Sequence, residues 1–304
     1  MLQLLCSFRT SLVNADGKLG LRGPTSQMNA VNFDAYWPYN FLSLRPTYKV
    51  SDWDVARPIM DEYLAKTREE RGPMFCGWNI CGDTLFTSES FHNAGAVAEH
   101  LENVQPLVDK LLSSGAATLE RMELHGPTSE LAKCKGAIKG SVDAAFFEID
   151  SGCTFLVRPY AGMSRGHAHF SIAPYFKVSD WATAQPLLDE CVEKMRRTAG
   201  CVFFGWTKSG DDTLFCNCAF TNADGLRAHL ASVDSIVVAL LDGPATLESV
   251  SVHGPKTRLL EVKDATDSYH GLAPDYFAIE SGFQRYEVTV GLPQNPLGML
   301  DYGK

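Results

Sequence analysis

Residues 176–192 read FKVSDWATAQPLLDECV, and residues 48–64 read YKVSDWDVARPIMDEYL. The two stretches share the opening Lys-Val-Ser-Asp-Trp and a proline at the same place, and Trp53 and Trp181 fix the offset at 128 residues (181 minus 53). A near-copy of this length indicates that the chain contains two versions of one structural unit.

The repeat extends beyond these stretches, and the alignment of the two copies shifts by a single residue at some turns. FCGWNICGDTLF from Phe75 corresponds to FFGWTKSGDDTLF from Phe203, and ATLERMELHGP corresponds to ATLESVSVHGP. Insertions of one residue are tolerated at the tips of hairpins, so these shifts mark loops. We predict a lead-in segment at 1–35, a first unit at 36–152, a second unit at 153–282 and a tail at 283–304.

Each unit shows the same order of secondary structure. An alternating stretch such as FLSLRPTYKV is typical of a strand, and the Ser-Asp pair that follows it is typical of a helix N-terminus. Pro58 and Pro186 predict a kink or a late start in that helix. A hairpin, a second helix capped by Asn93 or Asn222, and a further alternating strand complete a β-α-β-β-α-β order. A short helix and one more strand follow it.

This order predicts an α+β fold of two tandem ferredoxin-like units. Such a sheet carries helices on one face and leaves its other face bare. Exposed apolar area costs about 25 cal/mol per Å², so two units gain stability by facing each other. We therefore expect an intramolecular dimeric α/β barrel, with the extra strand of each unit joining the halves.

Composition excludes several other classes. Apolar residues make up 45% of the 304 residues and charged residues 21%, with a net charge of −9, which is ordinary globular composition without a basic nucleic-acid footprint. The sequence contains no run of 18 apolar residues, so we predict no membrane-spanning segment. Nine cysteines without zinc-site spacing indicate reduced thiols in an intracellular compartment, cytoplasmic or organellar, and no metal site.

The Gly-Trp pair of the third predicted element and the stretch AEHLENVQPLVDKLL resemble the dimeric α/β-barrel superfamily, and within it the antibiotic-biosynthesis-monooxygenase-like (ABM-like) proteins. The resemblance covers residues 40–282. It implies a fused version of a homodimer, with a pocket in each unit between sheet and helices. Members include cofactor-independent monooxygenases acting on aromatic or quinol-like molecules, haem-degrading enzymes and proteins without a known reaction.

The two copies retain several residues that suit such a pocket. His100 and His229 are the candidate catalytic residues, because a neutral imidazole accepts a proton near pH 7. The candidate ligand-binding residues are Trp78, Phe86, Trp206 and Phe215. For the histidines and tryptophans the competing interpretation is an ordinary buried core residue. For His125 and His253, which end a strand before Gly-Pro, we expect hydrogen bonds that stabilise a turn.

Three functions stay open from the sequence. The first is an ABM-like monooxygenase-type protein that binds an aromatic or quinol-like molecule in each unit. The second is a non-catalytic small-ligand-binding or structural protein, and the third is a haem-binding or haem-degrading protein. We expect a small hydrophobic or aromatic partner, no nucleic acid, no cofactor, and a pseudo-dimer within one chain, for which a monomer is one option.

Overall fold

Each half of the chain begins with a strand that leads directly into a capped helix. In the first half, β2 (Leu42–Val50) precedes α1 (Trp53–Glu69), and the Asp52 carboxylate accepts hydrogen bonds from the amides of Asp54 and Val55. In the second half, β7 (Ser171–Val178) precedes α4 (Trp181–Met195), which Asp180 caps in the same way. Both helices begin at the tryptophan and continue through the proline, so the expectation of a late start was wrong.

The computed structural model describes residues 36–37, 41–136, 138, 143–155, 169–284 and 300–301. The remaining elements of the first half are β3 (Pro73–Cys81), β4 (Thr84–Phe91), α2 (Ala94–Ser113), β5 (Ala117–Gly126), α3 (Thr128–Cys134) and β6 (Ala144–Phe155). Those of the second half are β8 (Cys201–Ser209), β9 (Thr213–Phe220), α5 (Ala223–Leu241), β10 (Ala245–Pro255), the 3-10 helix η2 (Leu259–Val262), α6 (Lys263–Thr266) and β11 (Asp275–Gln284). Two short strands, β1 (Tyr36–Trp37) and β12 (Leu300–Asp301), pair with β6 and β11.

The strand order confirms two ferredoxin-like units. Within the halves the antiparallel orders are β5-β2-β4-β3 and β10-β7-β9-β8. The tail strands then connect the halves, because β6 lies parallel to β5 and antiparallel to β8, while β11 lies parallel to β10 and antiparallel to β3. The result is a closed barrel of ten strands within one chain, as predicted.

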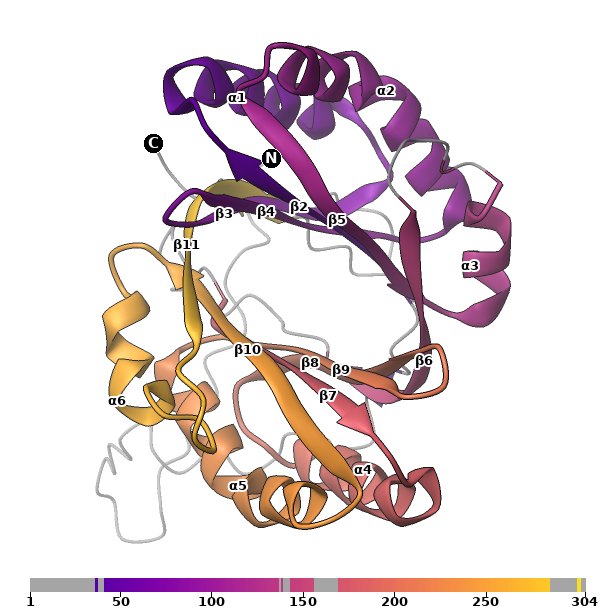
Figure 1. Ribbon diagram of the computed structural model, residues 1–304, viewed down its shortest axis with the longest axis vertical. Helices are drawn as coiled ribbons and strands as arrows, with labels where there is room; N and C mark the ends of the chain where they lie inside the picture. Colours follow the sequence, from indigo (N-terminus) through magenta and orange to yellow (C-terminus); the bar gives the residue numbers. More distant parts are fainter. Residues whose placement is uncertain are drawn as a thin grey trace, which may run out of the picture. The chain divides into compact units, whose positions relative to one another are not determined.

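The helices cover the outer surface of this barrel. Figure 1 shows α1 and α2 against the strands of the first half, and α4 and α5 against those of the second. The large apolar clusters lie in these helix–sheet layers, for example around Trp206 and Leu226. A small cluster of Phe147, Ala173 and Phe215 brings side chains of both halves together inside the barrel. Each sheet therefore covers the bare face of the other.

No described helix is long and apolar enough to cross a membrane. In the described part of the chain, eight cysteines are free thiols, and no group of three His, Cys, Asp or Glu side chains could hold a metal ion. The unit boundaries at 35/36, 152/153 and 282/283 remain predictions, as does the cellular compartment.

Candidate functional site

His100 lies at the centre of the buried face of α2. In the sequence, His100 comes three residues after Val97 and four before Val104, and this spacing predicts a buried side chain at the edge of an apolar stripe. The buried positions of the helix are Ala94, Val97, His100, Val104, Leu107 and Leu111, whereas Leu101 is only partly buried. The imidazole is 0% exposed. The prediction that this side chain is buried is confirmed.

A cluster of polar side chains surrounds His100 between α1, α2 and β4. Its Nδ1 lies 2.9 Å from Glu70 Oε2, and its Nε2 lies 2.8 Å from the hydroxyl of Tyr63. Nε2 is also 2.9 Å from Glu89 Oε2, a close ion-pair contact without the alignment of a hydrogen bond. Tyr63 donates to the other oxygen of Glu89 at 2.7 Å, and Asn103 donates to Glu70. We call these residues the His100 cluster.

The carboxylates keep His100 charged. Burial by itself lowers the pKa of a histidine, but the neighbouring Glu89 and Glu70 outweigh that effect and raise the pKa of His100 to about 9. Both ring nitrogens then donate. An imidazolium in this position is not a general base at neutral pH, and it has no lone pair for iron. The geometry of the first half therefore does not fit haem ligation through His100.

His229 occupies the equivalent position on α5 in entirely different surroundings. It is 3% exposed, and stacks on Phe220 at 4.9 Å between ring centroids. The repeat places Cys191, Thr198 and Cys218 where the first half has Tyr63, Glu70 and Glu89. With no carboxylate partner, burial lowers the pKa of His229 to about 3, so the ring is neutral.

The hydrogen bonds of His229 fix its tautomer. Nδ1 lies 2.8 Å from the sulfur of Met195. Because a thioether sulfur only accepts hydrogen bonds, the ring proton lies on Nδ1. Nε2 remains an acceptor, and it makes no hydrogen bond to a described residue.

Trp78 and Trp206 lie on the helix side of their strands, both 2% exposed. The indole N–H of Trp78 donates to the carbonyl of Met60 at 3.2 Å, and the ring packs edge-on against Tyr63. The indole N–H of Trp206 is buried and has no partner among the described residues. The equivalent tryptophans are thus satisfied in the first half and unsatisfied in the second.

A small cavity joins Trp206 to His229. Its walls come from α4, α5 and strands β7 to β9, and Cys191, Cys216 and Tyr269 also line it. Its volume is about 10 Å³, about the space that one water molecule needs. The free donor of Trp206 and the free acceptor of His229 belong to residues that line this same cavity.

Phe86 and Phe215 lie on the opposite face of the sheet. Both rings point into the barrel lumen, where the guanidinium carbon of Arg45 lies 4.6 Å from each ring centroid. The structure therefore does not bring these phenylalanines to the tryptophans or to His100 and His229. Phe86 pairs across the hairpin with Asn79, the neighbour of Trp78. Because neighbouring side chains along a strand point to opposite faces, Phe86 and Trp78 are on opposite sides of the sheet.

His125 and His253 also face the lumen, and they do not stabilise turns as expected. His125 Nδ1 lies 2.9 Å from Thr207 Oγ1, and His253 Nδ1 lies 3.3 Å from Asn79 Oδ1. Each histidine therefore contacts the opposite half of the chain. The expectation of a turn failed because the partner that decides the role of each histidine is more than 80 residues away in sequence.

Sequence reasoning missed Tyr63, Glu70 and Glu89. A signal for Glu89 was present, since it is an acid in the middle of the strand TLFTSESF and its counterpart is Cys218. A charged side chain on the buried, helix-covered face of a strand needs a partner of opposite charge or a hydrogen bond. None of these three residues is retained in the second half, so a search for residues common to both copies does not find this cluster.

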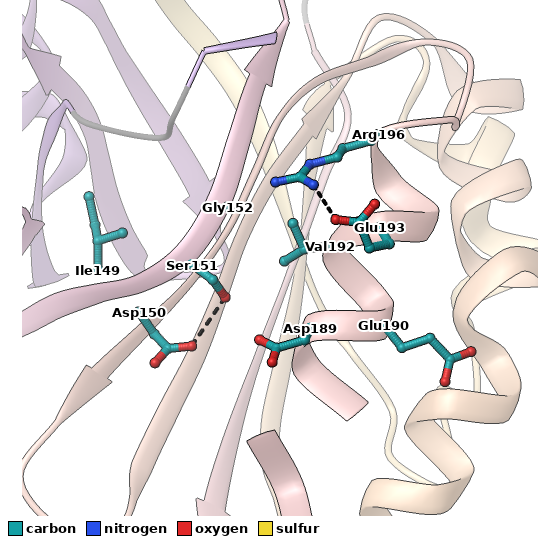
Figure 2. Close-up of a pocket in the computed structure, with 9 residues that line it drawn as sticks. All are labelled: Ile149, Asp150, Ser151, Gly152, Asp189, Glu190, Val192, Glu193 and Arg196. Carbon is teal, nitrogen blue, oxygen red and sulfur yellow. Dashed lines mark hydrogen bonds and ion pairs between the residues drawn. The ribbon is translucent and has the colours of Figure 1, made fainter. Parts of the chain in front are cut away.

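A surface groove of about 480 Å³ lies between β6 and α4. Figure 2 shows residues of β6 on one side, including Asp150, and on the other side residues of α4 together with its C-cap Arg196, which forms an ion pair with Glu193. Asp150 forms an ion pair with Lys208, with 2.6 Å between Asp150 Oδ1 and Lys208 Nζ. None of the candidate site residues lines this groove, so we do not assign it to the predicted pocket.

Several solved structures are similar to this chain at low sequence identity. No protein-family model and no curated protein matches the chain. MupZ from Pseudomonas fluorescens is 23% identical and matches 40% of this chain and 96% of its own, with a TM-score of 0.35. A candidate monooxygenase from Fusobacterium nucleatum is 10% identical and matches 70% of this chain and 91% of its own, with a TM-score of 0.48. A ferredoxin-fold protein related to antibiotic biosynthesis monooxygenases, from Listeria monocytogenes, is 8% identical and matches 70% of this chain and 95% of its own, with a TM-score of 0.35. The strand order of the chain itself shows the predicted barrel of two ferredoxin-like units.

Proposed function

We propose that the protein binds a small aromatic molecule with one hydroxyl or carbonyl oxygen, and that it does so in the second half only. The observation that carries this proposal is the indole N–H of Trp206, which is buried without a partner in the described part of the chain and lies beside the cavity that His229 also lines. A buried donor without an acceptor costs about 1–3 kcal/mol. A ligand oxygen at this point removes that cost.

His229 supplies the complementary group. Its Nε2 is an acceptor without a hydrogen bond to a described residue, and burial keeps the ring neutral. A phenolic hydroxyl fits both groups, because its oxygen accepts from Trp206 and its proton is donated to His229. The remaining walls are apolar or thiol side chains such as Phe204 and Cys216, which suit an aromatic ring.

The first half has the same fold but the opposite polarity. The space beside Trp78 contains the His100 cluster, with a cation and two carboxylates in mutual contact. An apolar ring in that place would separate buried charges, at a cost of several kcal/mol. We therefore replace the expectation of two similar pockets with one ligand pocket and one structural ion cluster.

Binding requires the lining side chains to move. The cavity of about 10 Å³ holds a water molecule but no aromatic ring. The binding free energy must offset the outward movement of α4 or α5, and this predicts modest affinity. A single bound water on Trp206 is the competing occupant.

The test compares two probes and two matched variants. Native mass spectrometry of the purified chain shows any copurified ligand, and fluorescence titration then measures the affinity for 2-naphthol and for naphthalene. We expect wild-type protein to bind 2-naphthol more tightly, by about tenfold for one net hydrogen bond. Trp206→Phe, which leaves only His229 as a partner for the hydroxyl, should reduce this preference, whereas Trp78→Phe, the equivalent change in the first half, should leave it intact. Equal affinities for both probes in wild type would contradict the proposal.

A monooxygenase reaction is the second candidate, and the position of His229 favours it. Oxygenation of an electron-rich ring begins with loss of a proton, and His229 is the proton acceptor at the cavity wall. Because burial lowers its pKa to about 3, this role requires that the bound substrate raise the pKa of His229. Oxygen uptake with 1,4-dihydroxynaphthalene, compared between wild type and His229→Gln, separates the two candidates. Uptake above the uncatalysed rate that disappears in His229→Gln would indicate an enzyme; binding of 2-naphthol without such uptake would indicate a carrier.

A further inference from the structure

The barrel lumen contains four polar positions at which the two halves differ. Arg45, Arg121, Glu123 and Tyr175 stand where the other half has Ala173, Ser249, Ser251 and Thr47. The aromatic residues beside them are retained in both halves, including Phe86 and Phe215. The lumen thus contains aromatic residues that are the same in both halves and a polar cluster that is present only once.

Arg45 lies between the two retained phenylalanines. Its guanidinium carbon is 4.6 Å from the centroid of Phe86 in its own half and 4.6 Å from that of Phe215 in the other half. The residue is 5% exposed. Cation–π contact on both faces stabilises the charge, but it supplies no acceptor for the N–H groups at the edge of the guanidinium plane.

The Nε of Arg45 is buried and makes no hydrogen bond to a described residue. Its nearest charged partner is Glu123 Oε2, a distant ionic contact at 3.9 Å. Two residues along β2, on the same face, the hydroxyl of Thr47 is also buried without a partner. Buried donors of this kind are rarely left without an acceptor, and a charged one is especially costly.

The charge of the cluster leaves a positive excess. Glu123 is shared by Arg121 at 3.2 Å, Tyr175 at 2.6 Å and His125 at 3.4 Å. Burial raises the pKa of a carboxyl, but these donors and Arg45 outweigh it and lower the pKa of Glu123 to about 2. Burial lowers the pKa of His125 to about 4 and that of His253 to about 3, so neither adds charge at neutral pH. Two arginines therefore face a single carboxylate.

We propose that the lumen beside Arg45 is a binding site for a small monoanion of the acetate class, held by the guanidinium N–H groups of Arg45 and the hydroxyl of Thr47. The planar fork of an arginine matches a carboxylate. A single negative charge balances the cluster, and a dianion would exceed it. Arg121, whose side chain is 51% exposed, connects the cluster to solvent. This site lies on the other side of the sheet from the Trp206 cavity and does not depend on it.

Thermal unfolding in chloride-free buffer tests the site. Sodium acetate is titrated at constant ionic strength against sodium gluconate, whose much larger anion serves as the reference. A ligand that binds only the folded state raises the melting temperature with saturation, and we expect a rise of about 3 °C or more. Arg45→Ala, which copies Ala173, should abolish the saturable rise. The same rise in this variant, or no rise in wild type, would overturn the proposal.

Two further variants keep the test decisive if Arg45→Ala fails to fold. Arg45→Met keeps an unbranched side chain between the two phenylalanine rings without any N–H donor, and it should also lose the acetate response. Thr47→Val keeps the shape of the side chain without the hydroxyl, and it should raise the Kd for acetate severalfold. An acetate response that is unchanged in both variants refutes the proposed contacts, and leaves non-specific salt stabilisation as the explanation.

Discussion

His100 and His229 occupy the same position in two copies of one unit, yet the pKa of His100 is raised to about 9 and that of His229 is lowered to about 3. The cause is the surroundings: Glu70 and Glu89 contact His100, whereas His229 is bonded to Met195 and stacked on Phe220. The two halves therefore differ in charge at equivalent positions: His100 carries a proton and a positive charge at neutral pH, and His229 is neutral.

His100 should make the protein less stable in mild alkali. The folded pKa of about 9 exceeds the unfolded value of about 6.5, so the folded state binds the proton more tightly. Its stabilisation is complete below pH 6.5 and is lost as the pH rises through 9. We expect a loss of about 3 kcal/mol across this window, measured by urea unfolding. His100→Gln should remove this slope, and a variant that keeps the full slope would contradict the assignment.

The neutral buried histidines should act in the opposite direction. His125, His229 and His253 have lowered pKa values in the folded state, so the unfolded chain binds more protons than the folded chain below pH 6.5. Stability should therefore fall as the pH drops from 6.5 towards 4. His229→Phe should flatten part of this acid slope in urea unfolding. An acid slope identical to that of wild type would show that His229 does not stay neutral.

The two tryptophans should respond differently to loss of the indole N–H. Trp78→Phe removes a hydrogen bond to Met60 and should cost about 1 kcal/mol beyond the change in packing. Trp206→Phe removes a donor that has no partner among the described residues, so it should cost less or stabilise the protein. Denaturant unfolding of the two variants side by side decides this, and a greater loss for Trp206→Phe would show that its N–H is satisfied.

Tyr63→Phe should destabilise the first half by about 1–3 kcal/mol. The hydroxyl is buried and contacts both Glu89 and His100, and its loss leaves a buried carboxylate oxygen without a donor. The matched control is Tyr276→Phe, because that hydroxyl bonds to Asp267 near the surface. Equal, small effects of the two changes in urea unfolding would speak against a structural role for the His100 cluster.

The contact between β11 and β3 should not tolerate a side chain at Gly282. A Cβ there would lie 2.7 Å from the carbonyl oxygen of Cys76 and 2.9 Å from the Cα of Gly77. Gly282→Ala should therefore separate the strands that join the halves, with a loss of about 2 kcal/mol or more and a lower melting temperature. Gly243→Ala is the control, since no atom lies within 4 Å of its Cβ position, and a loss as large as that of Gly282→Ala would contradict this interpretation.

The sequence by itself determined the elements and their pairing into two units. The retained Ser-Asp-Trp pattern set the helix starts at Trp53 and Trp181, and periodicity identified the buried face that carries His100. The repeat also predicted the closed barrel, because a ferredoxin-like sheet with one bare face needs a cover. These properties depend on residues close in sequence or on the hydrophobic pattern, which one chain displays directly.

The tertiary structure alone decided what the retained residues do. His100 is charged because Glu70 from the end of α1 and Glu89 from β4 converge on it, and His125 faces the lumen beside Thr207 of the other half. Phe86 and Trp78 are divided between the two faces of one sheet. The energy of a buried polar group depends on the partners within about 3 Å of it. Those partners come from segments far apart in the chain, so identical residues in the two copies acquire different charges and different roles.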